Sequence, residues 1–187
     1  MPMKNTARPQ PKKNNPHVMV LPLPGVAGGR SAPKLSLSVQ YAISAKSLPR
    51  WRLRRWIARA VAYGASESVQ NVQLTLRLVG SVESQRLNFG YRTKSKPTNV
   101  LTFDYNEFDT DELVLADIVI CTPVLKAEAR AQGKTYLDHA AHLVIHGTLH
   151  ALGHDHIKPA QAQLMEGLER RILASLSIAD PYATEKK

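Results

Sequence analysis

Three histidines of this chain share the spacing of a metal site that forms where a helix ends. His146 and His150 are four residues apart, so on an α-helix they lie one turn apart on the same face and can point a ring nitrogen at one ion. Gly153 follows, and glycine readily adopts the left-handed conformation that ends a helix. The chain can then turn back and bring His156 to the same point.

Three imidazole ligands are typical of a catalytic zinc site. Zinc binds histidine nitrogens at about 2.0–2.1 Å, and three protein ligands leave the fourth tetrahedral position open to water. The sequence therefore predicts one zinc ion per chain, held by His146, His150 and His156. Each other histidine of this region, taken singly, is better explained as a packed, hydrogen-bonded residue.

The same spacing occurs in the zinc-peptidase pattern H-E-x-x-H-x-x-G-x-x-H, but this chain has Gly147 where that pattern has glutamate. That glutamate is the general base of peptide hydrolysis. A metallopeptidase with an unusual base is therefore the least favoured function for this chain.

Positive charge is concentrated in the N-terminal part of the chain. Residues 1–66 contain 12 of the 25 Lys and Arg and none of the 15 Asp and Glu, so the rest of the chain carries a net charge of −2. This asymmetry indicates a polyanionic partner, with RNA and DNA ahead of an acidic membrane surface. Five of these residues are arginines between Leu48 and Tyr63, and they either bind RNA or solvate a helix.

The composition also bears on the compartment. Cys121 is the single cysteine of the 187 residues, so an internal disulfide is impossible and nothing indicates an oxidising environment. No apolar run approaches the roughly 18 residues that span a bilayer. We therefore expect a cytoplasmic protein with no membrane partner.

Two regions are expected along the chain. Residues 1–33 contain 7 of the 12 prolines and are predicted to form a disordered basic arm. Residues 34–182 are predicted to form the folded catalytic domain.

Hydrophobic periodicity in the folded region predicts an α+β domain, with a mixed four-stranded sheet packed by about five helices and the zinc site at the end of the histidine-bearing helix. The last helix should bury one leucine-rich stripe. The expected strands begin near Lys34 and cover 72–78, 99–105 and 113–121, and the expected helices cover 48–63, 82–89, 123–132, 135–152 and 160–176. The buried stripe of the last helix is expected to comprise Leu164, Leu168, Ile172 and Leu176.

Three blocks together resemble one family. The pattern H-G-x-L-H-x-x-G-x-D-H is matched from His146 to His156, and L-N-x-x-Y-R-x-x-x-x-P-T-[DN]-V-L-[ST]-F is matched from Leu87 to Phe103. The segment from Asp117 to Cys121 is similar to a G-D-I-x-I strand. These are the signatures of the YbeY endoribonucleases, also described as rRNA maturation factors, and the likeness covers roughly residues 35–182.

The resemblance implies a single-strand-specific, metal-dependent endoribonuclease that acts in 16S rRNA 3′-end maturation and ribosome quality control. A zinc-bound water would attack the RNA phosphodiester, and Arg92, which matches the family's functional arginine, would stabilise the phosphate. The implied partners are precursor 16S rRNA, the small ribosomal subunit and a ribosomal protein or an Era-like GTPase.

His154 occupies a position that is commonly tyrosine in the family, which adds an alternative third ligand. Ala116 replaces the glycine that usually precedes the strand aspartate. A second function also stays open, in which the protein is a non-catalytic, rRNA-binding ribosome-assembly factor with a structural zinc.

Overall fold

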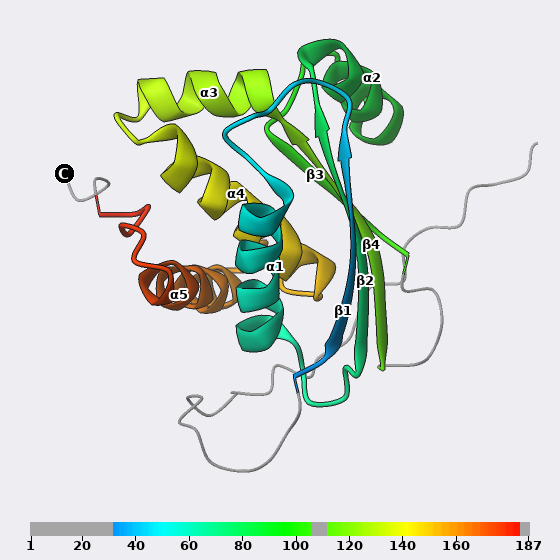
Figure 1. Ribbon diagram of the computed structural model, residues 1–187, viewed down its shortest axis with the longest axis vertical. Helices are drawn as coiled ribbons and strands as arrows, with labels where there is room; N and C mark the ends of the chain where they lie inside the picture. Colours follow the sequence, from blue (N-terminus) through cyan, green and yellow to red (C-terminus); the bar gives the residue numbers. More distant parts are fainter. Residues whose placement is uncertain (1–31, 106–111, 184–187) are drawn as a thin grey trace, which may run out of the picture.

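The computed structural model describes residues 32–105 and 112–183. Within them, five helices and a four-stranded sheet form one α+β unit (Figure 1). The strands are β1 (Lys34–Tyr41), β2 (Asn71–Val79), β3 (Val100–Asp104) and β4 (Leu113–Cys121). The helices are α1 (Arg50–Gly64), α2 (Ser81–Arg92), α3 (Thr122–Ala131), α4 (Tyr136–Ala151) and α5 (Pro159–Ser175). Every expected strand and helix is present.

Two expectations cannot be compared with the structure. The disordered arm predicted over residues 1–33 lies outside the described residues except for Ala32 and Pro33. The acidic stretch 106–112, which its composition predicts to be a solvated connection between two strands, lies outside them except for Glu112.

The sheet is mixed, as predicted. Its strand order is β1-β2-β4-β3, with β1, β2 and β4 parallel and β3 antiparallel to β4. Alternate residues of β2, from Val72 to Leu78, are buried on the face that α1 and α4 cover. This period-two burial follows from the pleat, because successive side chains of a strand point to opposite faces.

Helix α4 lies between the sheet, α1 and α5 in Figure 1 and is buried on most of its surface. Alanine and aliphatic residues such as Val144 and Ile145 are fully buried. Helix α1 packs beside it through the predicted stripe of Leu53, Trp56 and Ile57. The histidine-bearing helix is therefore held by apolar contacts on several sides.

The opposite face of the sheet has a smaller apolar cluster. Val119 and Cys121 of β4 are buried there, and Leu87 of α2 packs against them. Cys121 is 1% exposed and serves as a small core residue. Helix α2 thus covers the sheet face that points away from α4.

Helix α5 differs in one detail from the expectation. Leu168 and Ile172 are buried, but Leu164 is 47% exposed, and the neighbouring Met165 fills the core at 2% exposure. The buried stripe is therefore displaced by one residue at the start of the helix, where a flexible methionine side chain fills the gap.

Gly147 allows α4 to lie close to the sheet, and Gly147→Ala is expected to destabilise the fold. A Cβ at this position would lie 2.9 Å from Cγ2 of Ile118 and 3.2 Å from Cγ2 of Val100. We expect the free energy of unfolding to fall by about 1–3 kcal/mol, as for other overpacked cores. Denaturant unfolding measures this change.

The matched control is Gly167→Ala on α5, where an added Cβ has no neighbour within 4 Å. Alanine is favoured over glycine inside a helix by about 0.5–1 kcal/mol, so this variant should be as stable as the parent or more stable. Equal stability of both variants would contradict the close packing inferred at Gly147. The same packing leaves no room for the peptidase glutamate.

Candidate metal centre

The end of α4 turns the chain back at Gly153, as the sequence predicts. Gly153 has a φ of +88°, its N–H donates to the carbonyl of His150 at 3.0 Å, and the N–H of His154 donates to the carbonyl of Leu149 at 3.0 Å. This pair of hydrogen bonds is a Schellman motif. It directs the following residues, including His156, back toward the last turn of α4.

The structure brings the three predicted ligands together. One potential ligand atom from each of His146, His150 and His156 lies within 4.8 Å of the other two. The Nε2 atoms of His146 and His150 are 3.1 Å apart, close to the separation of about 3.4 Å expected for two nitrogens at tetrahedral positions around zinc. This separation fits either a hydrogen bond between the two rings or two ligands of one ion, so the cluster can hold a metal ion.

Glu169 of α5 fixes which nitrogen of His146 is available. Its Oε1 atom lies 2.7 Å from Nδ1 of His146, so the carboxylate accepts a hydrogen bond from Nδ1–H. The proton is then on Nδ1, which leaves the lone pair of Nε2 facing His150. A carboxylate behind a ligand histidine is a common means of orienting the ring and making it more basic.

Glu169 has further hydrogen bonds although it is only 1% exposed. Its Oε2 accepts from the hydroxyl of Tyr182 and lies 3.3 Å from Nε2 of His142. Burial alone would raise the pKa of Glu169, but the bonds to His142, His146 and Tyr182 outweigh it and lower the pKa to about 2. The carboxylate therefore stays charged behind His146.

The histidines also lie beside a cavity. A cavity of about 350 Å³ is lined by His146, His156 and Tyr182, together with Glu169 and three further residues of α5. Burial, together with the nearby His146 and His156, lowers the pKa of His150 to about 4. His150 is thus neutral near pH 7, the form that binds a metal ion.

The remaining histidines of the region have other partners. His139 is 3% exposed and lies 3.0 Å from Glu128 of α3, so it is a packed residue. His154, the alternative ligand, donates from Nε2 to the carbonyl of Gly64 at 2.8 Å. This bond directs His154 to the end of α1, and His156 is the third member of the cluster.

Two acidic residues are placed by their hydrogen bonds. The carboxylate of Asp155 accepts from the N–H of His156 at 2.7 Å, which caps the turn. Asp117 accepts from the hydroxyl of Tyr105 at 3.1 Å, and it alternates along β4 with Ala116 and Ile118, which face α4. Asp117 therefore points to the face away from the histidines.

Arg92 is the last residue of α2 and is exposed. Within residues 32–105 and 112–183, no ion pair or hydrogen bond engages its guanidinium, and it is not among the residues that line the histidine cavity. The loop after it is held to α2, because Asn88 donates to the carbonyl of Lys96 at 2.8 Å. This loop leads into β3, where Thr102 donates to the carbonyl of Gly147 at 3.3 Å.

Glu169 and Tyr182 were not identified from the sequence. Glu169 is 23 residues from His146, on another helix, so no local spacing connects them. The available signal is a carboxylate between Leu168 and Ile172, on the face of α5 that is otherwise apolar. A buried carboxylate needs a partner that donates hydrogen bonds to it. The histidine cluster is a group in this sequence that can supply such donors.

No helix within the described part of the chain is both long and apolar enough to cross a membrane.

Comparison with known proteins identifies close relatives. A family profile described as "Endoribonuclease YbeY" matches residues 39–177. A Bordetella petrii protein named Endoribonuclease YbeY is 57% identical over 156 residues, which cover 81% of this chain and 99% of the relative. The proteins of the same name from Bordetella pertussis and Alkalilimnicola ehrlichii are 54% and 45% identical, covering 81% and 86% of this chain and 98% and 99% of the relatives.

A solved structure supports the fold. The solution structure of a Thermotoga maritima protein superposes with a TM-score of 0.50 at 21% identity, covering 78% of this chain and 97% of that protein. At this identity the similarity concerns the fold alone.

Proposed function

This chain belongs to the endoribonuclease YbeY family, and from this membership we propose that it is a single-strand-specific, zinc-dependent endoribonuclease. Its role would be 16S rRNA 3′-end maturation and ribosome quality control. The observation that carries the proposal is the cluster of His146, His150 and His156, whose ligand atoms lie within 4.8 Å of one another. The carboxylate of Glu169 behind His146 supports it.

The donor set suits zinc, which prefers imidazole nitrogen and four-coordinate geometry. When bound, zinc would supply Lewis acidity toward the phosphate and lower the pKa of water to about 7. Glu169 keeps the proton of His146 on Nδ1, so that Nε2 stays free to bind. The cavity beside His146 and His156 offers room for the reacting phosphate.

Arg92 is proposed to hold a phosphate of the substrate through two hydrogen bonds of its planar guanidinium. It is exposed at the end of α2, and β3 is an edge strand that contacts α4 through Thr102 and Gly147. We propose that an RNA strand lying along this edge of the sheet reaches both Arg92 and the histidine-bearing helix. Negative charge accumulates on the phosphoryl oxygens during cleavage, so a cation is needed there.

The proposed partners follow from this function. Precursor 16S rRNA is the substrate, and the small ribosomal subunit is the site of action, reached through a ribosomal protein or an Era-like GTPase. The compartment is the cytoplasm, and no membrane partner is proposed. These assignments rest on the family, together with the excess of positive charge over residues 1–66.

The second candidate is a non-catalytic rRNA-binding assembly factor with a structural zinc. The exposed arginines of α1 favour it, because they supply RNA affinity independently of any metal. The two functions differ in what the metal does, and this difference can be measured.

We expect His156→Ala to abolish cleavage and preserve RNA binding. His156 is exposed and lies after α4, so its loss removes a ligand without opening the core. Cleavage of a structured rRNA fragment should fall below detection, while the dissociation constant for the same RNA changes by less than about threefold. A structural metal would instead make stability and RNA affinity fall together, and this result would favour the assembly factor.

A further inference from the structure

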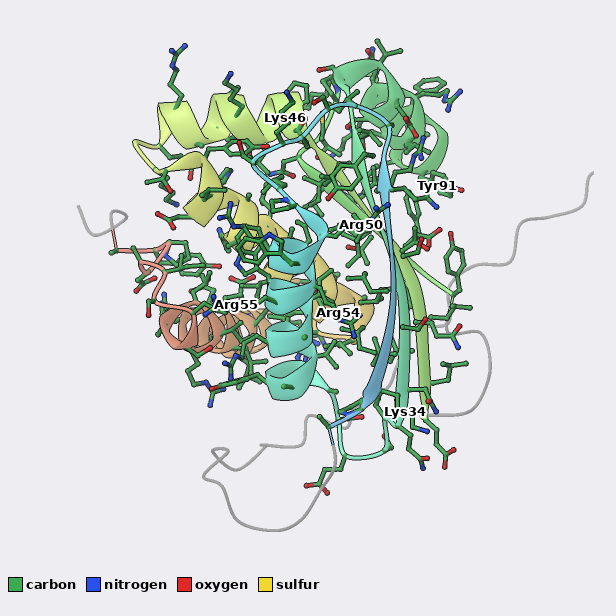
Figure 2. All side chains as sticks on the ribbon, in the orientation of Figure 1. Lys34, Lys46, Arg50, Arg54, Arg55 and Tyr91 are labelled. Carbon is green, nitrogen blue, oxygen red and sulfur yellow. The ribbon has the colours of Figure 1, made fainter. Side chains whose placement is uncertain are left out.

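The outer face of α1 carries positive charge without the acidic residues that usually accompany it. Arg54, Arg55 and Arg59 are exposed, and Trp51 beside them is 60% exposed. We call these four residues the α1 arginine face. In Figure 2, Arg54 and Arg55 lie on either side of α1, because consecutive residues of a helix are about 100° apart, and both belong to its solvent-facing side.

No acidic side chain within residues 32–105 and 112–183 forms an ion pair with these arginines. Helix α5 shows the alternative arrangement, because its Arg170 contacts Glu166 at 3.3 Å and Asp180 at 3.4 Å. On α1, Arg55 and Arg59 are four residues apart, and like charges at this spacing repel each other. A face that served solubility alone would be expected to mix both signs.

Other arginines of α1 are already engaged. Arg50 donates to the carbonyl of Val39 at 2.9 Å, and Arg52 donates to the carbonyl of Ser47 at 2.7 Å. The guanidinium of Arg52 also lies 4.9 Å from the ring centroid of Trp51. These contacts hold the start of the helix and the indole in place. Within the α1 arginine face, Arg59 lies 5.9 Å from the ring centroid of Tyr63, and no hydrogen bond or ion pair among the described residues engages the guanidinium groups of the three arginines.

The chemistry of the face favours single-stranded RNA. Guanidinium groups bind phosphates through paired hydrogen bonds, and an exposed indole offers a surface on which a base can stack. Arg55 and Arg59 are about 6 Å apart along the helix axis, so each can contact a different phosphate of one strand. Insertion into a membrane is disfavoured, because the apolar face of α1, including Leu53 and Ile57, is buried in the core.

The C-terminal end of α1 also lies next to the turn that carries His156. His154, two residues before His156, donates to the carbonyl of Gly64 at 2.8 Å, and Gly64 is the last residue of α1. A strand bound along the helix therefore has one end near the turn that carries His156.

We propose that the α1 arginine face is a phosphate-binding surface that holds single-stranded RNA and directs it toward the histidine cluster. This inference rests on the proposed function. It adds a binding surface to that function and assigns no chemical step to these residues.

The test compares the full-length parent with the triple variant Arg54→Gln/Arg55→Gln/Arg59→Gln. The probe is a fluorescein-labelled phosphorothioate single-stranded RNA, which resists cleavage, and its affinity is measured by fluorescence anisotropy over a range of salt. We expect binding to weaken at least about tenfold at low salt, and the slope of log K against log salt to become less steep by about 2, or about 0.7 per lost contact.

The control is Lys126→Gln/Arg130→Gln, which removes two exposed charges from α3 and should change the affinity by less than about threefold. Equal loss in both variants would mean that only total charge matters and would overturn the inference. So would loss of binding to anionic phosphatidylserine vesicles with no change in RNA binding.

Cleavage of unmodified RNA by the same proteins separates this inference from the proposed function. If the parent cleaves RNA and the triple variant binds like the parent, the α1 arginine face has no such role and the proposed function stands. If the triple variant loses affinity but the parent never cleaves, the α1 arginine face is supported and the nuclease assignment is wrong.

Discussion

Replacing His146 with alanine is expected to remove both the metal and the cleavage of RNA. Mass spectrometry of the purified parent should find about one equivalent of zinc per chain, and less than about a tenth of that in His146→Ala. Cleavage of a structured rRNA fragment should disappear with the metal. The reason is geometric, because Nε2 of His146 lies 3.1 Å from Nε2 of His150 and two ligands do not hold zinc at an open site.

Chelation gives the reversible form of the same experiment. Cleavage by the parent should stop when the metal is removed and return when one equivalent of zinc is added, whereas His146→Ala should stay inactive. His154→Asn is the matched control, because His154 lies in the same turn but bonds to the carbonyl of Gly64. Loss of zinc in His154→Asn would show that the third ligand had been misassigned. Zinc in the parent without cleavage would favour the assembly factor.

Glu169→Gln is expected to weaken zinc binding by about 10–100-fold, the usual effect of losing a carboxylate behind a ligand histidine. The amide oxygen can still accept from Nδ1 of His146, but it lacks the charge that makes the ring a better ligand. Competition with a chromophoric chelator measures the zinc affinity directly, without reference to cleavage. Cleavage at saturating zinc should recover in part.

The matched control for this variant is Glu166→Gln on the same helix, which removes a carboxylate that pairs with Arg170 at 3.3 Å. Its zinc affinity should change by less than about threefold, because a partly exposed ion pair contributes little. Glu169→Asp keeps the charge but shortens the side chain, and we expect an intermediate affinity. Unchanged zinc affinity in Glu169→Gln would show that the carboxylate only packs the core.

The parts of the centre that depend on local chain geometry could be predicted from the sequence. Helical periodicity places His146 and His150 on one face, and the left-handed conformation of Gly153 brings His156 back. These relations span one helix and one turn. The strands and helices could be predicted for the same reason, since each has its own hydrophobic period.

The parts that depend on packing between distant elements could not be predicted. The sequence left His154 as an alternative ligand, and its hydrogen bond joins it to Gly64, 90 residues away. The Glu169 carboxylate meets His146 only because α5 packs against α4. Met165 takes the buried place expected for Leu164 for a similar reason, since the angle at which α5 packs decides which of two adjacent apolar residues is buried.

The carboxylate support of His146 also has a consequence for the order of events during synthesis. All three histidines leave the ribosome before Glu169, and Tyr182 follows 13 residues after Glu169. A nascent chain that ends between His156 and Glu169 contains the three ligands but not the group that keeps the proton of His146 on Nδ1. The metal centre thus reaches its final form only after α5 has been made and has docked, so a nascent chain that has exposed only α4 and the following turn lacks the group that orients His146.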